Sequence, residues 1–241
     1  NKDLSEEAYL VRNAVVRSDL QGDSRTLNQM LGSKYPHRLG EVYGRALAEP
    51  SPGSAAHLAD AIAVSELPHQ IKLDLLASGL ESYESHMRVS ALKALAKVDT
   101  AVSKREFLRD NRRDLTVGHF HLANAWPDEH IWQELARLVE RAGLGLRLNY
   151  ISVGVTPFSG PSRAQLRFLL HFFDDAEYDP EKFGQPTSKV ADYGYSVQNL
   201  AAARAGYYLL KPAKMPDPGE SKLFWGNYRK KIRALILRRL G

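Results

Sequence analysis

Three histidines lie close together near the middle of this 241-residue sequence, at His119, His121 and His130. Imidazole is a common zinc ligand, and a zinc site on one helix favours two histidines that are four residues apart. His119 and His121 are only two residues apart, which directs them to different sides of a helix, and no His-Glu-x-x-His motif occurs. We therefore interpret these histidines as structural residues and expect neither a metal site nor a cofactor.

An acidic run is the second group that could carry chemistry. Its members are Asp174, Asp175, Glu177, Asp179 and Glu181. Calcium needs ligands that alternate around a glycine turn, and acid–base catalysis needs one carboxyl group in an apolar pocket. The run satisfies neither condition, so we interpret it as a solvated loop that ends a helix. Such a loop could still contact a partner.

The tripeptide Trp126-Pro127-Asp128 places an aromatic side chain beside a carboxylate. In a helical chain the simplest role of Asp128 is to cap a helix N-terminus or to place a negative charge in its first turn. No glycine-rich phosphate loop, Gly-x-Ser-x-Gly elbow or recognisable Ser/His/Asp set occurs elsewhere. The sequence thus predicts no catalytic residue and favours a protein that is not an enzyme.

The formal net charge of +5 is concentrated in residues 219–241, which alone sum to +6, whereas the rest of the chain sums to −1. This distribution argues against a surface-wide field for nucleic acid. We expect residues 219–241 to form an amphipathic helix that caps a helical array. Its basic surface comprises Arg229, Lys230, Lys231 and Arg233. A set of charges that is so uniformly positive would also suit an acidic partner. The alternative to a capping helix is an element that binds nucleic acid or a membrane surface.

The rest of the composition is that of an ordinary globular protein, with 44% hydrophobic and 25% charged residues. No run reaches the roughly 18–20 apolar residues that cross a bilayer. The N-terminal residues 1–7 are polar and lack the apolar core of a secretory signal, so we expect a cytoplasmic protein. The missing initiator methionine indicates a processed or trimmed chain. Zero cysteines exclude disulfides and thiolate metal sites.

Helical periodicity recurs along most of the chain and is clearest over residues 85–98. The apolar positions of this amphipathic segment are Met87, Ala91, Leu92, Ala94, Leu95 and Val98. Its small alanines would let a neighbouring helix approach closely. The segment 146–155 is ambiguous, because its β-branched and aromatic residues would allow a strand. The overall pattern predicts an all-α protein.

Fragments related to the 85–98 helix recur along the chain. Aligned on the residue that corresponds to Arg88, they fall at positions 12, 57, 88, 118, 147 and 198, and the three middle intervals are 31, 30 and 29 residues. This period fits two short antiparallel helices and two turns. Residues 87–95 and 197–205 resemble the second helix of HEAT-type repeats. The near-30 spacing resembles the short repeat of the phycobilisome-lyase-like branch of that family.

The resemblance implies a right-handed α-α superhelix, a solenoid of the HEAT-like or armadillo type with about five or six helical hairpins. We expect a single domain over residues 1–241. The second helices of such a stack line its concave side. The expected partner-binding residues are therefore Arg88, Lys93, Gln198, Asn199 and Arg204. The predicted function is a non-enzymatic scaffold that binds a protein or peptide on this face.

Two other functions stay open. Helical-repeat DNA glycosylases of the alkylation-repair class use aromatic residues and an acidic residue in a basic groove. This chain is similar to them in size, helical make-up and pI alone. A bilin lyase-like enzyme is the alternative that the repeat branch implies, although no residue here identifies its site.

Overall fold

The computed structural model describes residues 5–16, 23–48, 53–111, 115–155, 160–177, 195–210 and 214–241. Within these ranges it consists of α-helices and one 3-10 helix without any strand, so the predicted all-α class is confirmed. The chain divides into two compact units, Asn1–Asp114 (unit 1) and Leu115–Gly241 (unit 2). The single domain expected over residues 1–241 stays a prediction.

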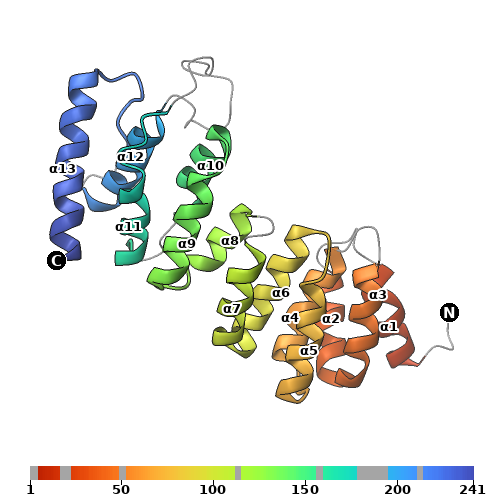
Figure 1. Cartoon of the computed structure of the whole chain (residues 1–241). Helices are drawn as coiled ribbons and strands as arrows, with labels where there is room; N and C mark the ends of the chain where they lie inside the picture. The colour runs from red at the N-terminus through yellow and green to blue at the C-terminus, as the bar shows by residue number, and fades with distance from the viewer. Residues whose placement is uncertain are drawn as a thin grey trace. The chain divides into compact units, whose positions relative to one another are not determined.

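Unit 1 contains the first seven α-helices and the 3-10 helix (Figure 1). They are α1 (Glu6–Val16), α2 (Asp23–Lys34), η1 (Pro36–Arg38), α3 (Leu39–Ala48), α4 (Gly53–Val64), α5 (His69–Gly79), α6 (Ser85–Val98) and α7 (Thr100–Asp110). Alternate helices pack side by side. In one layer α2 lies on α4 and α4 on α6, and in the other α1 lies on α3 and α3 on α5. The hydrophobic core of the unit lies between these two layers.

The α6 helix has the bounds that its periodicity predicts and packs against α4, α5 and α7. Its apolar face is buried from Met87 to Leu95, and Val98 is half-buried. The alanines Ala91 and Ala94 are fully buried, which allows the close approach expected from their size. This helix is therefore the central support of the C-terminal half of unit 1.

Unit 2 contains the remaining six helices, again in two layers. They are α8 (Val117–Ala123), α9 (Glu129–Glu140), α10 (Leu144–Gly154), α11 (Arg163–His171), α12 (Val197–Leu209) and α13 (Lys222–Leu240). In one layer α8 packs on α10 and α10 on α12, and in the other α9 packs on α11 and α11 on α13. The ambiguous segment 146–155 lies in α10, where packing between α8 and α12 overrides its β propensity.

Aromatic side chains fill the core of unit 2. The rings of Phe120 and Tyr150 stack with their centroids 5.3 Å apart, and Trp132 meets Phe168 edge to face at 5.3 Å. Phe120 also lies against Gly154 of α10, where an added β-carbon would be 2.6 Å from its ring. The helix start at Asp128 is as predicted, because its carboxylate accepts hydrogen bonds from the backbone amides of His130 and Ile131.

The aligned repeat positions fall on alternate helices from α4 onwards. They are His57 on α4, Arg88 on α6, Gly118 on α8, Arg147 on α10 and Gln198 on α12. Arg12 lies on α1 and is out of step with this series. No helix in the described segments has the length and apolar content that a membrane span requires.

Candidate functional site

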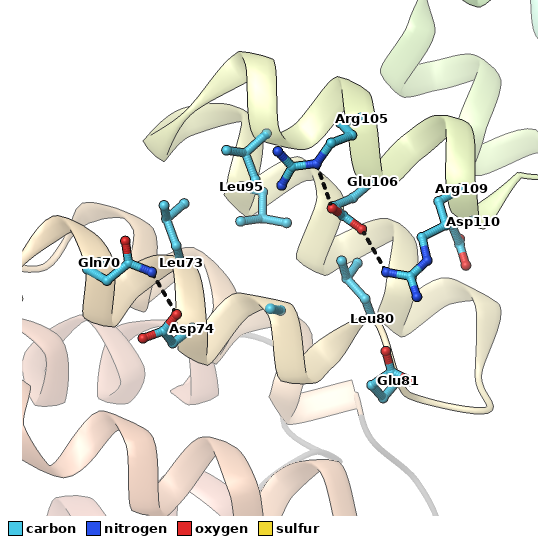
Figure 2. A pocket seen from close by; sticks show the side chains of 12 residues that line it. Gln70, Leu73, Asp74, Leu80, Glu81, Leu95, Arg105, Glu106, Arg109 and Asp110 are labelled. Atoms are coloured by element: carbon cyan, nitrogen blue, oxygen red, sulfur yellow. Dashed lines mark hydrogen bonds and ion pairs between the residues drawn. The ribbon is translucent and has the colours of Figure 1, made fainter.

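A groove opens between α5 and α7 in unit 1 (Figure 2). Both helices pack on α6, and α5 also packs on α3 and α4. The groove has a volume of about 630 Å³, which is within the range of roughly 300–1,000 Å³ typical of binding pockets. One wall is a face of α5 together with the turn that follows it, from Gln70 to Glu81, and the other is a face of α7, from Val102 to Asp110.

The floor of the groove is apolar. It is formed by Leu73, Ala77, Leu80, Leu95 and Val102. Leu95 belongs to the fully buried core, whereas Leu73, Leu80 and Val102 are half-buried and pack against that core from the groove side. Figure 2 shows Leu73, Leu80 and Leu95 between the two walls. Partly exposed leucines in a concave surface are typical of a site that another apolar surface covers.

Charged side chains line the rim. On α7 the carboxylate of Glu106 lies between two guanidinium groups, 3.0 Å from Arg105 Nε and 3.6 Å from Arg109 Nη1. Glu106 is largely buried, whereas the side chains of Arg105 and Arg109 are 71% and 81% exposed. On α5 the amide of Gln70 donates a 2.8 Å hydrogen bond to Asp74. The groove therefore combines an apolar floor with ionised groups at its edges.

Arg88 was expected on a partner-binding face, and the structure places it in the interior of unit 1. Its side chain is 2% exposed, and its Nε donates a 2.7 Å hydrogen bond to Oδ1 of Asp110. Its Nη1 donates to the backbone carbonyls of Ser82 and Tyr83 at 3.0 and 2.9 Å. Arg88 therefore ties the end of α7 and the α5–α6 connection to α6, because a buried guanidinium needs both a counter-charge and acceptors.

Arg147 occupies the corresponding position on α10 and is held in a similar way. It donates hydrogen bonds to Asp175, at 2.6 Å, and to Glu177, both of which follow α11. Burial alone would lower the pKa of this guanidinium, but the two carboxylates more than offset that effect, so its pKa lies above the usual value. In both units the arginine at the aligned repeat position thus links its helix to the end of the helix that follows it.

The other expected partner-binding residues differ in their surroundings. Lys93 is exposed on α6 of unit 1. Gln198, Asn199 and Arg204 are half-buried on α12 of unit 2. The carbonyl of Asn199 accepts a hydrogen bond from Arg229, and Arg204 donates to Ser152 at 2.7 Å. Binding of a partner by these residues stays a prediction, and of this set Lys93 is the one that the structure exposes.

The four residues of the basic surface predicted for the C-terminal helix lie on α13 and differ in their exposure to solvent. Arg229 and Arg233 are half-buried, and Arg233 donates a 2.6 Å hydrogen bond to Asp174 and lies over the ring of Phe173. Burial lowers the pKa of Arg229, an effect that Asp174 opposes and Arg233 adds to. Lys230 and Lys231 are exposed. Part of the positive charge therefore serves packing within unit 2.

The histidines and the acidic run belong to unit 2 and are not among the residues that line the groove. His119 is fully buried, with its Nδ1 near the hydroxyl and amide of Thr116, whereas His121 and His130 are exposed. Asp179 and Glu181 lie outside the described residues. In the part of the chain that the structure describes, no group of three or more His, Asp or Glu side chains is arranged to hold a metal ion.

A second hollow, of about 290 Å³, lies between α9 and α11 in unit 2. Trp132 and Phe168 contribute its aromatic lining. Arg167 on α11 forms an ion pair with Glu129 on α9 across this hollow, and the two helices pack directly on each other. The α5–α7 groove has more than twice the volume of this hollow, so it is the better candidate for a binding site.

Sequence reasoning did not identify this groove, since its two walls are separated in the sequence by the whole of α6. One signal was present: α5 carries apolar residues on more than one side, with Leu76 in the core and Leu73 toward the groove. Comparisons with protein-family models, curated proteins and solved structures found no match to this chain. The family resemblance therefore stays a prediction.

Proposed function

We propose that this chain is a non-enzymatic interaction scaffold whose α5–α7 groove binds a segment of a partner protein. The observation that carries the proposal is the row of half-buried apolar side chains between two charged rims. Burial of such a row against another protein is favourable, at about 25 cal/mol per Å² of apolar surface removed from water. The charged rims would remain at the edge of the interface, where water reaches them.

The groove suits a protein segment better than a small molecule. Small-molecule sites bury most of the ligand and direct a few polar groups inward at it. Here Arg105 and Arg109 extend into solvent, and the buried pair of Arg88 and Asp110 is already engaged. An elongated apolar floor between two helices is instead the surface that amphipathic helices occupy in known recognition modes.

The proposal includes the architecture, a right-handed superhelical stack of the HEAT-like kind. Two features support it. Within each unit, alternate helices pack on one another in two layers. The aligned repeat positions from His57 to Gln198 fall on the even-numbered helices from α4 to α12. Solenoids of this kind expose long surfaces between successive hairpins, which is where the groove lies.

A groove-blocking variant tests the proposal. Ala77 is exposed on α5 and lines the groove, so Ala77→Trp would fill it without disturbing the core. Ser78 is exposed on the same helix and does not line the groove, which makes Ser78→Trp the matched control. Both variants should keep the wild-type melting temperature within about 2 °C, because both sites lie on the surface.

The measurement is affinity purification from the source cells with the wild-type chain and both variants, followed by mass spectrometry. A partner that is retained by wild type and by Ser78→Trp, but lost with Ala77→Trp, would support the groove. Identical partners with all three proteins would place binding elsewhere. Steeply salt-dependent DNA binding that survives in both variants would favour the nucleic-acid alternative instead.

A further inference from the structure

The two walls of the groove carry opposite charge. Asp74 and Glu81 lie on the α5 wall, and Arg105 and Arg109 lie on the α7 wall around Glu106 (Figure 2). Asp74 lies on α5 itself, and Glu81 lies in the turn directly after this helix, where it also lines the groove. Arg105 and Arg109 are one helical turn apart on the facing flank of α7.

Neighbouring groups do not cancel this polarity. Glu106 is shared by Arg105 and Arg109, which leaves the α7 wall with one net positive charge. The partner of Asp74 is the neutral amide of Gln70, so the α5 wall keeps two negative charges. Asp110 also lines the groove, but it is paired with Arg88 at 2.7 Å.

On the basis of the function proposed above, we infer that the groove takes an amphipathic helix with Lys or Arg on the flank facing α5 and Asp or Glu on the flank facing α7. The apolar ridge of this helix lies on Leu73, Leu80 and Val102. The α5 wall has 11 helical residues, about 16 Å, so roughly three turns of the partner are in contact.

The same charges fix the direction of the bound helix. Turning the helix end for end exchanges its two flanks and places like charges against each wall, which is unfavourable. A helix with basic flanks only would meet Arg105 and Arg109, and one with acidic flanks only would meet Asp74 and Glu81. The groove therefore selects a mixed-charge helix and orients it.

Designed peptides can test this selectivity. The probes are helical 12-residue peptides with one leucine ridge and four flank patterns: basic and acidic, the same two flanks exchanged, all basic, and all acidic. Fluorescence anisotropy with the full chain should show both mixed peptides binding about tenfold more tightly than either single-sign peptide, since several exposed ion pairs of modest strength add up. Equal affinity of all four peptides would overturn the charge assignment.

Direction can be read by disulfide trapping, because the chain contains no cysteine. Gln70→Cys introduces one thiol at the end of the groove where α5 begins. Each mixed peptide is tested with a cysteine at its N-terminus or at its C-terminus. The trapped end should switch between a mixed peptide and its flank-exchanged version. Trapping of the same end in both, or of both ends equally, would overturn the inference.

Two variants distinguish a failure of the charge preference from a failure of the groove function. Asp74→Lys with Glu81→Lys alters only exposed positions, one on α5 and one in the turn after it, and should abolish the preference for mixed flanks while the leucine ridge still binds. Ala77→Trp should abolish binding of every peptide. If the peptides lose binding with Ala77→Trp but show no charge preference, the groove function stands and the inference fails. If binding survives Ala77→Trp, the groove function itself fails.

Discussion

The phenol oxygen of Tyr43 on α3 occupies the space that a β-carbon on Gly79, the last residue of α5, would fill. Tyr43 is almost completely buried, and its hydroxyl has no hydrogen-bond partner among the described residues. The bare backbone of Gly79 thus allows the tyrosine ring to reach α5, so the α3–α5 contact depends on the absence of a side chain at this glycine.

Gly79→Ala should therefore destabilise the protein by about 2 kcal/mol, because the added methyl group overpacks this contact. The change normally favours a helix, so a loss would have to come from the clash. In a Tyr43→Phe background the cost should be smaller, since the nearest remaining atoms are the β-carbon of Ala91 at 3.0 Å and the ring carbon of residue 43 at 3.3 Å. Urea unfolding followed by circular dichroism would measure both. The same cost in both backgrounds would contradict this account.

The buried hydroxyl also predicts an alkaline dependence of stability. Burial raises the pKa of Tyr43 well above its ordinary value of about 10. The phenol of the folded protein stays neutral at a pH where that of the unfolded chain ionises. The stability of the folded state is therefore unaffected by this group below about pH 10 and falls as the pH rises above that value.

Tyr43→Phe should make the fall in the urea midpoint between pH 9 and pH 11 shallower. At pH 8 the same variant should gain about 1 kcal/mol, since it removes an unpaired buried hydroxyl. Tyr83, which is 95% exposed, supplies the control: Tyr83→Phe should change neither value. Part of the alkaline slope will persist in every variant, because burial also raises the pKa of Tyr208 and Tyr228.

The sequence predicted helices better than it predicted their partners. The 85–98 periodicity is a local property and matched the bounds of α6. The sequence did not reveal the burial of Arg88, because its partner, Asp110, is 22 residues away. A helical pattern shows which residues share a face but not which distant acid meets them. The groove was missed for the same reason, since Leu73 and Arg105 line the same groove only because α5 and α7 both pack on α6.

The buried pair of Arg88 and Asp110 gives a third prediction. Asp110→Ala should cost about 3 kcal/mol or more, because it leaves a buried guanidinium without its counter-charge. Replacing both residues, as Arg88→Met with Asp110→Leu, should cost clearly less than Asp110→Ala alone, since no charge then remains buried. Urea unfolding would compare the two.

An exposed pair provides the matched control for that experiment. Arg45 and Glu41 are bonded at 2.7 Å on the surface of α3, with both side chains about half exposed. Arg45→Met should therefore cost less than about 0.5 kcal/mol. Equal losses for Asp110→Ala and Arg45→Met would show that burial does not set the strength of the Arg88 pair.

The last prediction concerns the counterpart arginine of unit 2, which positions the start of α12. Arg147 binds the side chains of Asp175 and Glu177. The backbone carbonyl of Asp175 accepts a 2.8 Å hydrogen bond from the amide of Gln198, and that of Glu177 accepts a 3.0 Å hydrogen bond from the amide of Val197. Arg147→Met removes both ion pairs and should raise the hydrogen-exchange rates of these two amides several-fold. Amides of α6 in unit 1 should not change. Arg167→Met, which removes a more exposed ion pair with Glu129, should leave the α12 amides protected, and equal exchange in both variants would contradict the role of Arg147.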